Sequence, residues 1–222
     1  MSVSTLPIEG SSVIANRLLA SLPRDEYAHL LPRLEFVKLP KNRILYEAGD
    51  PIHYGYFLKT GMVSFQAITD DGQTIDIGMV GNEGFLGDEI FLQADRSSGR
   101  ATTQFPCEAV RIEANALLAE FLRGGKLQEM LLRYTHVTKT QLAQAVPCNL
   151  FHSVEERFAR RLLVTSDCLG SDTFEMTQEQ LGIILSRHRI RISAAIVELK
   201  ERGLVEHSRG LIGIRDRKGL EA

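Results

Sequence analysis

The stretch TQEQLGIILSRHRIRISAAIVEL, residues 177–199, decides the fold of the C-terminal part of the chain. It begins with a capping box, in which the Thr177 hydroxyl accepts from the backbone amide of Gln180 while the Gln180 side chain reaches back. A break at residues 186–188 separates two apolar patterns of helical period. We therefore predict two short helices joined by a three- or four-residue turn. Their inward residues are Leu181, Ile184 and Leu185 in the first and Ile192, Ala195, Ile196 and Leu199 in the second.

The segment that follows, residues 203–214, adds a basic hairpin to these helices. Gly203 is placed to cap the second helix, and apolar residues then flank Ser208-Arg209-Gly210, which is typical of a turn between two short strands. Two short helices followed by such a hairpin form a winged helix-turn-helix pattern. In that arrangement the second helix enters the major groove of DNA.

The charge distribution favours the same interpretation. Residues 186–218 hold nine basic and four acidic residues, a net charge of +5, whereas the whole 222-residue chain has a net charge of -2. The rest of the chain therefore has a net charge of -7. An acidic body with a basic C-terminal segment indicates that this segment faces an anion.

The outward face of the second helix carries the residues that we expect to read the base sequence. Arg189 can bond O6 and N7 of one guanine through its guanidinium fork, a discrimination of about 1–3 kcal/mol, and Ile190 can touch a thymine methyl group. Ser193 and Ala194 lie on the same face. The residues suited to phosphate contacts, which set the register, are Thr177, Gln178, Arg187, Arg191 and Arg209.

Residues 36–113 have a strand pattern. Val63, Phe65 and Ala67 alternate with Ser64 and Gln66, so we expect one buried and one exposed face. Residues 75–79 alternate in the same way, and an Asp-Asp-Gly stretch at 70–72 is typical of a hairpin turn. Glycine-marked turns at this spacing favour a small antiparallel barrel or roll over a βαβ arrangement.

Helical periodicity begins after residue 115. A heptad-like seam predicts a long helix that ends near Pro147 and packs either on its own barrel or on a second copy of the chain. A second helix begins at Ser153, which has a capping-box partner in Glu156, and stops near Gly170. The seam consists of Leu127, Leu131, Tyr134, Thr138, Gln141 and Ala145.

Composition argues against several other classes of protein. The chain is 44% hydrophobic and 24% charged, which is ordinary for a globular protein. No apolar run approaches the length of a membrane helix, and the N-terminal residues lack a signal-peptide pattern, so we expect a cytoplasmic protein without membrane contact. The three cysteines, Cys107, Cys148 and Cys168, indicate neither a disulfide framework nor a zinc cluster.

An enzymatic function is not indicated. Metal catalysis in a small β-barrel needs two or three histidines and a carboxylate around one metal, and the barrel segment offers only His53. No nucleophile elbow or phosphate-binding glycine loop is present. We therefore expect neither catalytic nor metal-binding residues.

With these motifs in place, the sequence resembles the Crp/Fnr-type transcription regulators from about residue 18 onward. The resemblance depends on Glu47-Ala48-Gly49-Asp50, on Tyr56-Phe57-Leu58 with Gly61-Met62-Val63, on the glycine-rich stretch 78–87, and on residues 177–182 leading to Arg189. It implies an α+β chain with an antiparallel β jelly-roll sensor domain of the cyclic-nucleotide-binding kind, a dimerisation helix and a C-terminal winged helix-turn-helix.

The resemblance also implies domain boundaries and partners. We expect an N-terminal arm at 1–20, the sensor domain at 21–125, the dimerisation helix at 126–150, with the seam above as the dimer interface, and the DNA-binding domain at 151–222. A homodimer would bind double-stranded DNA with a two-fold symmetric site, and RNA polymerase is an expected partner. Ser186 replaces the usual turn glycine, and Ile190 and Ala194 stand where cyclic-AMP-responsive members often have Glu and Arg, so the target sequence should differ.

The effector is harder to predict. Cyclic-AMP binders have a Gly-Glu pair and, about ten residues later, an Arg-Ser pair whose arginine neutralises the cyclic phosphate. Here Glu89 lies only seven residues before Arg96, and Ala143 and Gln144 stand near the place of a Thr-Ser pair. We expect a ligand other than cyclic AMP. The candidate effector-binding residues are Gly87, Asp88, Glu89, Arg96, Ser97 and Ser98.

Two alternative functions remain open from the sequence. The chain could be a cyclic-AMP-responsive regulator, or a cyclic-nucleotide-binding module that controls a partner protein without touching DNA, which would leave the basic winged helix unexplained. The cofactor is unknown, and we expect no metal, haem or iron-sulfur cluster because the N-terminal cysteine cluster of iron-sulfur members is absent and His53 has no second ligand. A redox role for Cys148 is a further alternative.

Overall fold

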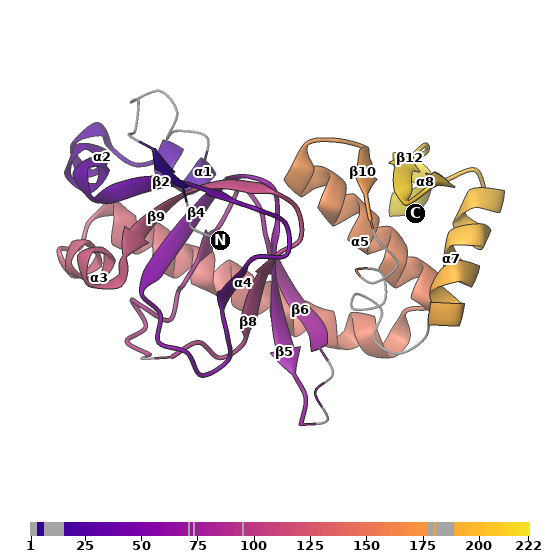
Figure 1. Cartoon of the computed structure of the whole chain (residues 1–222), viewed down its shortest axis with the longest axis horizontal. Helices are drawn as coiled ribbons and strands as arrows, with labels where there is room; N and C mark the ends of the chain where they lie inside the picture. Colours follow the sequence, from indigo (N-terminus) through magenta and orange to yellow (C-terminus); the bar gives the residue numbers. More distant parts are fainter. Residues whose placement is uncertain are drawn as a thin grey trace.

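A computed structural model describes residues 4–6, 16–70, 72, 74–94, 96–176, 180 and 189–222, with the side chains of 4–6 and 189–192 left aside. The chain has the predicted α+β class. A β-roll with short helices occupies one end of the molecule, a smaller unit built around α5, α7 and a small sheet occupies the other, and the long helix α4 runs from the first to the second (Figure 1). No helix in these ranges is long and apolar enough to cross a membrane.

The β-roll consists of two sheets, one of five strands and one of four, and all of its strand pairs are antiparallel. This confirms the predicted antiparallel roll. The five-stranded sheet has the order β1 (Ser4–Leu6), β2 (Leu34–Leu39), β9 (Cys107–Glu113), β4 (Tyr54–Thr60), β7 (Phe85–Leu86). The four-stranded sheet has the order β3 (Ile44–Tyr46), β8 (Arg100–Thr103), β5 (Val63–Ile68), β6 (Thr74–Val80).

The prediction of an exposed polar face on β5 is wrong. Ser64 and Gln66 are 0% and 3% exposed. The reason is that the smaller unit packs here, where Arg161 pairs with Asp76 and Gln180 donates to the carbonyl of Gln104. Within the roll, the buried polar groups have partners: Gln104 Nε2 donates to Ser64 Oγ at 2.7 Å, and Gln66 Nε2 donates to Asp76 Oδ1 at 2.8 Å. Strand β6 is likewise half-buried along most of its length rather than alternating.

Short helices close the roll. Asn16 caps α1 and is fully buried, because its Oδ1 accepts from the amides of Leu18 and Leu19 while its Nδ2 donates to the carbonyls of Leu58 and Gly84. This residue therefore ties the first helix to β4 and to the β6–β7 loop. The helices here are α1 (Arg17–Ala20), α2 (Arg24–Leu30), a 3₁₀ turn (Leu31–Arg33) and α3 (Ala114–Leu122).

Helix α4 (Lys126–Phe151) continues past Pro147, where the sequence predicted its end. Proline removes one helical hydrogen bond. Both Pro147 and Ala143, whose carbonyl that bond would have used, are exposed, so water can take the place of the missing donor. The helix instead ends at His152, which has an extended conformation.

Helix α5 (Val154–Leu169), the first element of the smaller unit, begins as predicted. It has a complete capping box between Ser153 and Glu156, and Gly170 ends it in the left-handed conformation. The unit continues with β10 (Thr173–Glu175), α7 (Arg189–Glu201), β11 (Val205–Ser208), β12 (Leu211–Ile214) and α8 (Arg217–Glu221). The hairpin β11–β12 confirms the predicted strands, whereas β10 and α8 had no recognised signal. The first predicted helix of the pair lies outside the described residues except for Gln180.

Both ends of the molecule share one apolar contact. Met62 and Phe105, from two loops of the roll, are 1% and 8% exposed and belong to the core of the smaller unit. Phe105 meets Phe174 edge-on, with ring centroids 6.3 Å apart. Next to them, Nε2 of Gln180 donates to the carbonyl of Gln104 at 2.8 Å. The roll therefore packs directly on the smaller unit.

Truncation of Phe105 to alanine tests this contact. We expect Phe105→Ala to lower the free energy of unfolding by about 3 kcal/mol or more, because a large buried ring is lost between the two units. Leu122, which is 63% exposed, provides the control, and Leu122→Ala should change stability by about 0.5 kcal/mol or less. Urea unfolding followed by circular dichroism measures both. Equal stabilities for the two variants would contradict the packing described here.

Candidate nucleic-acid interface and ligand cavity

Helix α7 has one buried and one exposed face. Ala195, Ile196 and Leu199 are at most 6% exposed and pack in the core of the smaller unit, as predicted. Ser193 and Ala194 are exposed on the other side. Their neighbours Arg189, Ile190 and Arg191 belong to the same helix, but their side chains lie outside the described residues, as do Thr177, Gln178 and Arg187 entirely.

The hairpin β11–β12 presents Arg209 at its tip. Arg209 has a positive φ of 50° and Gly210 one of 82°, which gives the tight turn that the sequence predicted there. The Arg209 side chain is exposed. An exposed cation on a two-stranded wing beside α7 has the geometry of a phosphate contact.

Helix α4 uses the predicted seam toward its own chain. Leu127 and Leu131 are 5% and 1% exposed and belong to the core of the β-roll. Their assignment to a dimer interface is therefore wrong, because nothing of their side chains is left for a partner. Tyr134 packs against the same core, and Thr138, Gln141 and Ala145 line a cavity.

The opposite face of α4 carries a stripe of exposed apolar side chains. Leu132 is 47% exposed and Leu150 72%. Large apolar side chains in such a row on one helix commonly mark a surface for another protein chain. We call this set the α4 stripe: Leu132, Val146 and Leu150.

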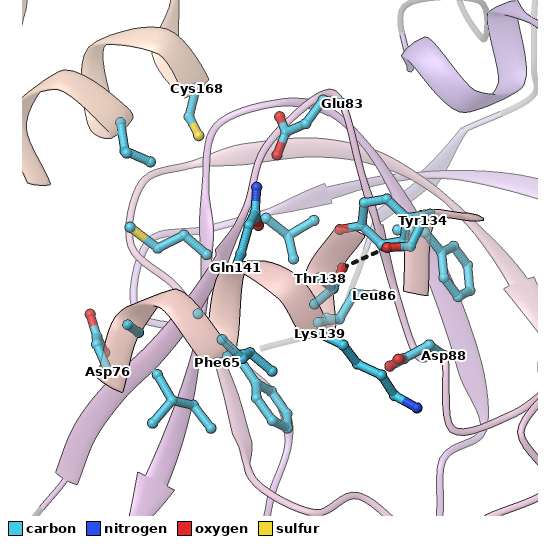
Figure 2. Close-up of a pocket in the computed structure, with 18 of the residues that line it drawn as sticks. Phe65, Asp76, Glu83, Leu86, Asp88, Tyr134, Thr138, Lys139, Gln141 and Cys168 are labelled. Carbon is cyan, nitrogen blue, oxygen red and sulfur yellow. Dashed lines mark hydrogen bonds between the residues drawn. The ribbon is translucent and has the colours of Figure 1, made fainter. Parts of the chain in front are cut away.

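A cavity of about 420 Å³ lies where β6, α4 and α5 meet. Figure 2 shows Glu83, Asp76 and Asp88 around it, with Gln141 and Thr138 of α4 between them. Thr138 donates to the carbonyl of Tyr134 at 3.0 Å, so its hydroxyl oxygen can still accept a hydrogen bond. The volume falls within the usual range for small-molecule sites.

The predicted effector residues divide into two groups around this cavity. Asp88, Glu89 and Ser98 line it. Gly87, Arg96 and Ser97 are not among the lining residues. The Arg96 guanidinium donates to the carbonyl of Gly49 at 2.6 Å on the surface, and the buried Ser97 hydroxyl donates to the carbonyl of Gly99 at 2.8 Å.

The part of the cavity wall contributed by the roll is acidic. Its charged residues, among those that the structure describes, are Asp76, Glu83, Asp88 and Glu89. Burial raises the pKa of Glu89, and the neighbouring Asp88 carboxylate raises that pKa further. Ser98 Oγ lies 3.5 Å from Glu89 Oε1. This wall therefore suits hydrogen-bond donors.

The opposite wall is basic, and none of its residues was among the predicted site residues. Arg157, Arg160 and Arg161 of α5 line the cavity. Arg161 is 6% exposed and pairs with Asp76 of β6 at 3.0 Å, and its burial lowers its pKa. The spacing i, i+3, i+4 on a capped helix is a signal that these arginines share one face, but it does not reveal what that face meets.

The three cysteines differ in exposure. Cys107 and Cys168 are buried, and burial raises the pKa of each thiol to about 12. Cys148 is half-buried and lines the cavity. In the part of the chain that the structure describes, no three His, Cys, Asp or Glu side chains are grouped as metal ligands.

Thiol alkylation tests this difference. Only the thiolate reacts, so at neutral pH we expect iodoacetamide to modify Cys148 in the folded protein and to leave Cys107 and Cys168 unmodified until the protein unfolds. Peptide mass spectrometry locates the modified residue, and Cys148→Ser should abolish the fast reaction. Fast modification of either buried cysteine would contradict the structure.

Comparison with known proteins agrees with this architecture. Residues 36–123 match the cyclic nucleotide-binding domain family, and residues 156–222 match the Crp-like helix-turn-helix domain family. A CRP-like cAMP-activated global transcriptional regulator of Mycobacterium tuberculosis is 24% identical over 186 residues, which cover 80% of this chain and 83% of that protein.

Solved structures share the fold at low sequence identity. The c-di-GMP responsive global regulator CLP of Xanthomonas campestris is 17% identical with a TM-score of 0.72, over 87% of this chain and 100% of the other. FixK2 of Bradyrhizobium japonicum is also 17% identical with a TM-score of 0.72, over 84% and 94% of the two chains. Since a cyclic nucleotide-binding domain, a long helix and a Crp-like helix-turn-helix follow one another here, the chain belongs to the Crp/Fnr-type family of non-enzymatic, DNA-binding transcription regulators.

Proposed function

We propose that the protein is a homodimeric regulator that recognises a two-fold symmetric DNA sequence and responds to a ligand other than cyclic AMP. The observation that carries the DNA-binding part is the orientation of α7. Its apolar side is buried while Ser193 and Ala194 are exposed, and the wing that follows carries the exposed Arg209. This arrangement supports insertion of the N-terminal half of α7 into a major groove, where Arg189 and Ile190 would read base edges and Thr177, Gln178, Arg187 and Arg191 would contact phosphates.

The α4 stripe supports the homodimer. Its residues recur along the exposed side of one long helix, which is the requirement for packing against the same helix of a second copy. A two-fold axis along paired α4 helices would place two copies of α7 for successive half-sites about one helical turn apart. Bound there, the dimer would act on transcription by contacting RNA polymerase or by blocking it.

The acidic wall of the cavity supports a ligand other than cyclic AMP. A cyclic phosphate carries a negative charge, and in the cyclic-AMP binders that this sequence resembles it pairs with an arginine of the roll. Arg96, the predicted candidate, is instead bonded to Gly49 at the surface, while Asp88 and Glu89 face the cavity. Repulsion between carboxylates and a cyclic phosphate at this wall disfavours the binding mode of a cyclic-AMP-activated regulator.

Selection from a random DNA duplex library, with and without cyclic AMP, tests the DNA-binding proposal. We expect a two-fold motif under both conditions. Arg189→Ala should weaken binding to the enriched site about tenfold or more, because a bidentate guanine contact is lost, while the fold and dimer persist. Fluorescence anisotropy of labelled duplexes measures the affinity.

Arg24, an exposed residue of α2 on the β-roll, provides the control. Arg24→Ala removes the same charge far from α7 and should leave the affinity unchanged. Equal affinity of Arg189→Ala and the wild type would contradict the proposed role of α7, and binding of DNA only with cyclic AMP would overturn the proposal about the ligand. Absence of any enriched motif would favour a module that acts without DNA.

A charge in the α4 stripe tests the homodimer. Leu150 is 72% exposed, so Leu150→Glu should leave the single chain folded but place two carboxylates in the paired-helix interface. We expect a monomer by size-exclusion chromatography with light scattering, where the wild type is a dimer. Leu122→Glu, at an exposed site on α3, is the control and should remain dimeric. A dimeric Leu150→Glu variant would place the interface elsewhere.

A further inference from the structure

The arginine face of α5 closes the cavity from the side of the DNA-binding unit. Arg157, Arg160 and Arg161 are three and four residues apart on one helix, and all three line the cavity. The roll and α4 form the other walls. Any molecule that fills this cavity therefore contacts the sensor domain and the first helix of the DNA-binding domain together.

These guanidinium groups have unused hydrogen-bonding capacity. Arg161 is 6% exposed, and its Nε has no hydrogen-bond partner although its Nη1 pairs with Asp76. Nε of Arg157 is also buried without a partner. Among the described residues, no carboxylate lies within ion-pair distance of Arg157 or Arg160. Glu156, the residue before Arg157 in α5, instead accepts a hydrogen bond from the backbone amide of Ser153.

Buried donors without acceptors are rare in folded proteins, and such groups beside a cavity indicate a bound acceptor. Arginine presents several N–H groups in a planar fork, which matches the oxygens of a phosphate group better than a single carbonyl does. Three such forks on one helix face can surround a doubly charged terminal phosphate. A neutral ligand would leave the charges of Arg157 and Arg160 without a counter-ion.

The remaining walls restrict the rest of the ligand. Asp76, which marks the Arg161 end, and Asp88 lie on opposite sides of the cavity in Figure 2. Lys139 of α4 also lines the cavity, and its single positive charge can offset only one of the two carboxylates Asp88 and Glu89. Both carboxylates accept hydrogen bonds, so the end of the ligand near them should carry hydroxyl or amino donors. Between the two ends, Phe65 and Leu142 give the cavity an apolar middle.

We propose that this cavity binds a small phosphomonoester with its phosphate on Arg157, Arg160 and Arg161 of α5 and its hydroxyl-bearing end toward Asp88 and Glu89. This inference rests on the proposed function in one respect, which is that it takes the cavity to be the effector site. The phosphate is held by the DNA-binding unit and not by the roll. Ligand binding then joins α5 to the roll through one molecule, which couples occupancy of the cavity to the position of the DNA-binding unit.

Inorganic pyrophosphate is the probe, because it presents terminal phosphate oxygens without a sugar or base. Isothermal titration of the full-length protein, at constant ionic strength set with sodium chloride, should give saturable binding of one pyrophosphate per chain. Arg157→Gln and Arg160→Gln should each weaken this binding about fivefold or more, since each removes a charged fork. Arg24→Gln, which removes an exposed arginine far from the cavity, should bind as the wild type does.

Arg161 is tested differently, because its loss would leave Asp76 buried and uncompensated. The double variant Arg161→Gln, Asp76→Asn keeps the pair neutral and hydrogen-bonded, and we expect it to fold and to bind pyrophosphate about fivefold or more weakly. Thermal unfolding monitored by circular dichroism verifies that each variant is folded.

Two results would overturn the proposal. One is the absence of saturable binding by the wild type, and the other is equal binding by the wild type and the α5 variants, which would mean an adventitious ion only. Fluorescence anisotropy with the selected DNA distinguishes failure of this proposal from failure of the proposed function. If the protein recognises DNA but does not bind pyrophosphate, only the ligand site is overturned. If the protein binds pyrophosphate through the α5 arginines but does not recognise DNA, only the regulator function is overturned.

Discussion

The ion pair between Asp76 of β6 and Arg161 of α5 joins two side chains that are 5% and 6% exposed, with the charged atoms 3.0 Å apart. Burying two charges carries a large desolvation cost, which their mutual attraction offsets only when the two groups lie close together. Gln66 also donates a hydrogen bond to Asp76. Because loss of either charge would leave the other uncompensated, this pair fixes where α5 lies against the roll. The wall of the cavity and the path of the chain into the winged unit follow from that position.

Apolar packing reinforces the same junction. Met62 and Phe105 leave the roll to enter the core of the smaller unit, next to the hydrogen bond between Gln180 and Gln104. Helix α4 completes the arrangement, with Leu131 in the roll core on one side and the α4 stripe on the other. A single helix thereby connects the sensor core, the cavity and the proposed dimer surface. Changes at one of these places can reach the others through rigid elements.

Local signals explain why much of the architecture was predictable. The capping box at Ser153, the helix end at Gly170 and the hairpin around Arg209 each depend on residues close together in sequence, and the structure contains all three. Local signals also led to the prediction that α4 ends at Pro147, which is wrong, and they gave no indication of β10. Proline in an exposed turn of a helix is compatible with continuation, and β10 is a three-residue strand that exists only because β12 pairs with it.

The sequence by itself determined the fold class, the winged helix-turn-helix and the outward position of Ser193 and Ala194, because periodicity states which side of an element is apolar. Only the tertiary structure decided what each side meets. Polar Ser64 is buried since a second unit covers its sheet, Leu127 and Leu131 of the α4 seam lie in the core of their own roll, and the arginines of α5 face a cavity opposite Asp88. Such contacts join residues that are far apart in the chain. A local sequence pattern does not specify which distant surface will pack against a given face of a helix or strand.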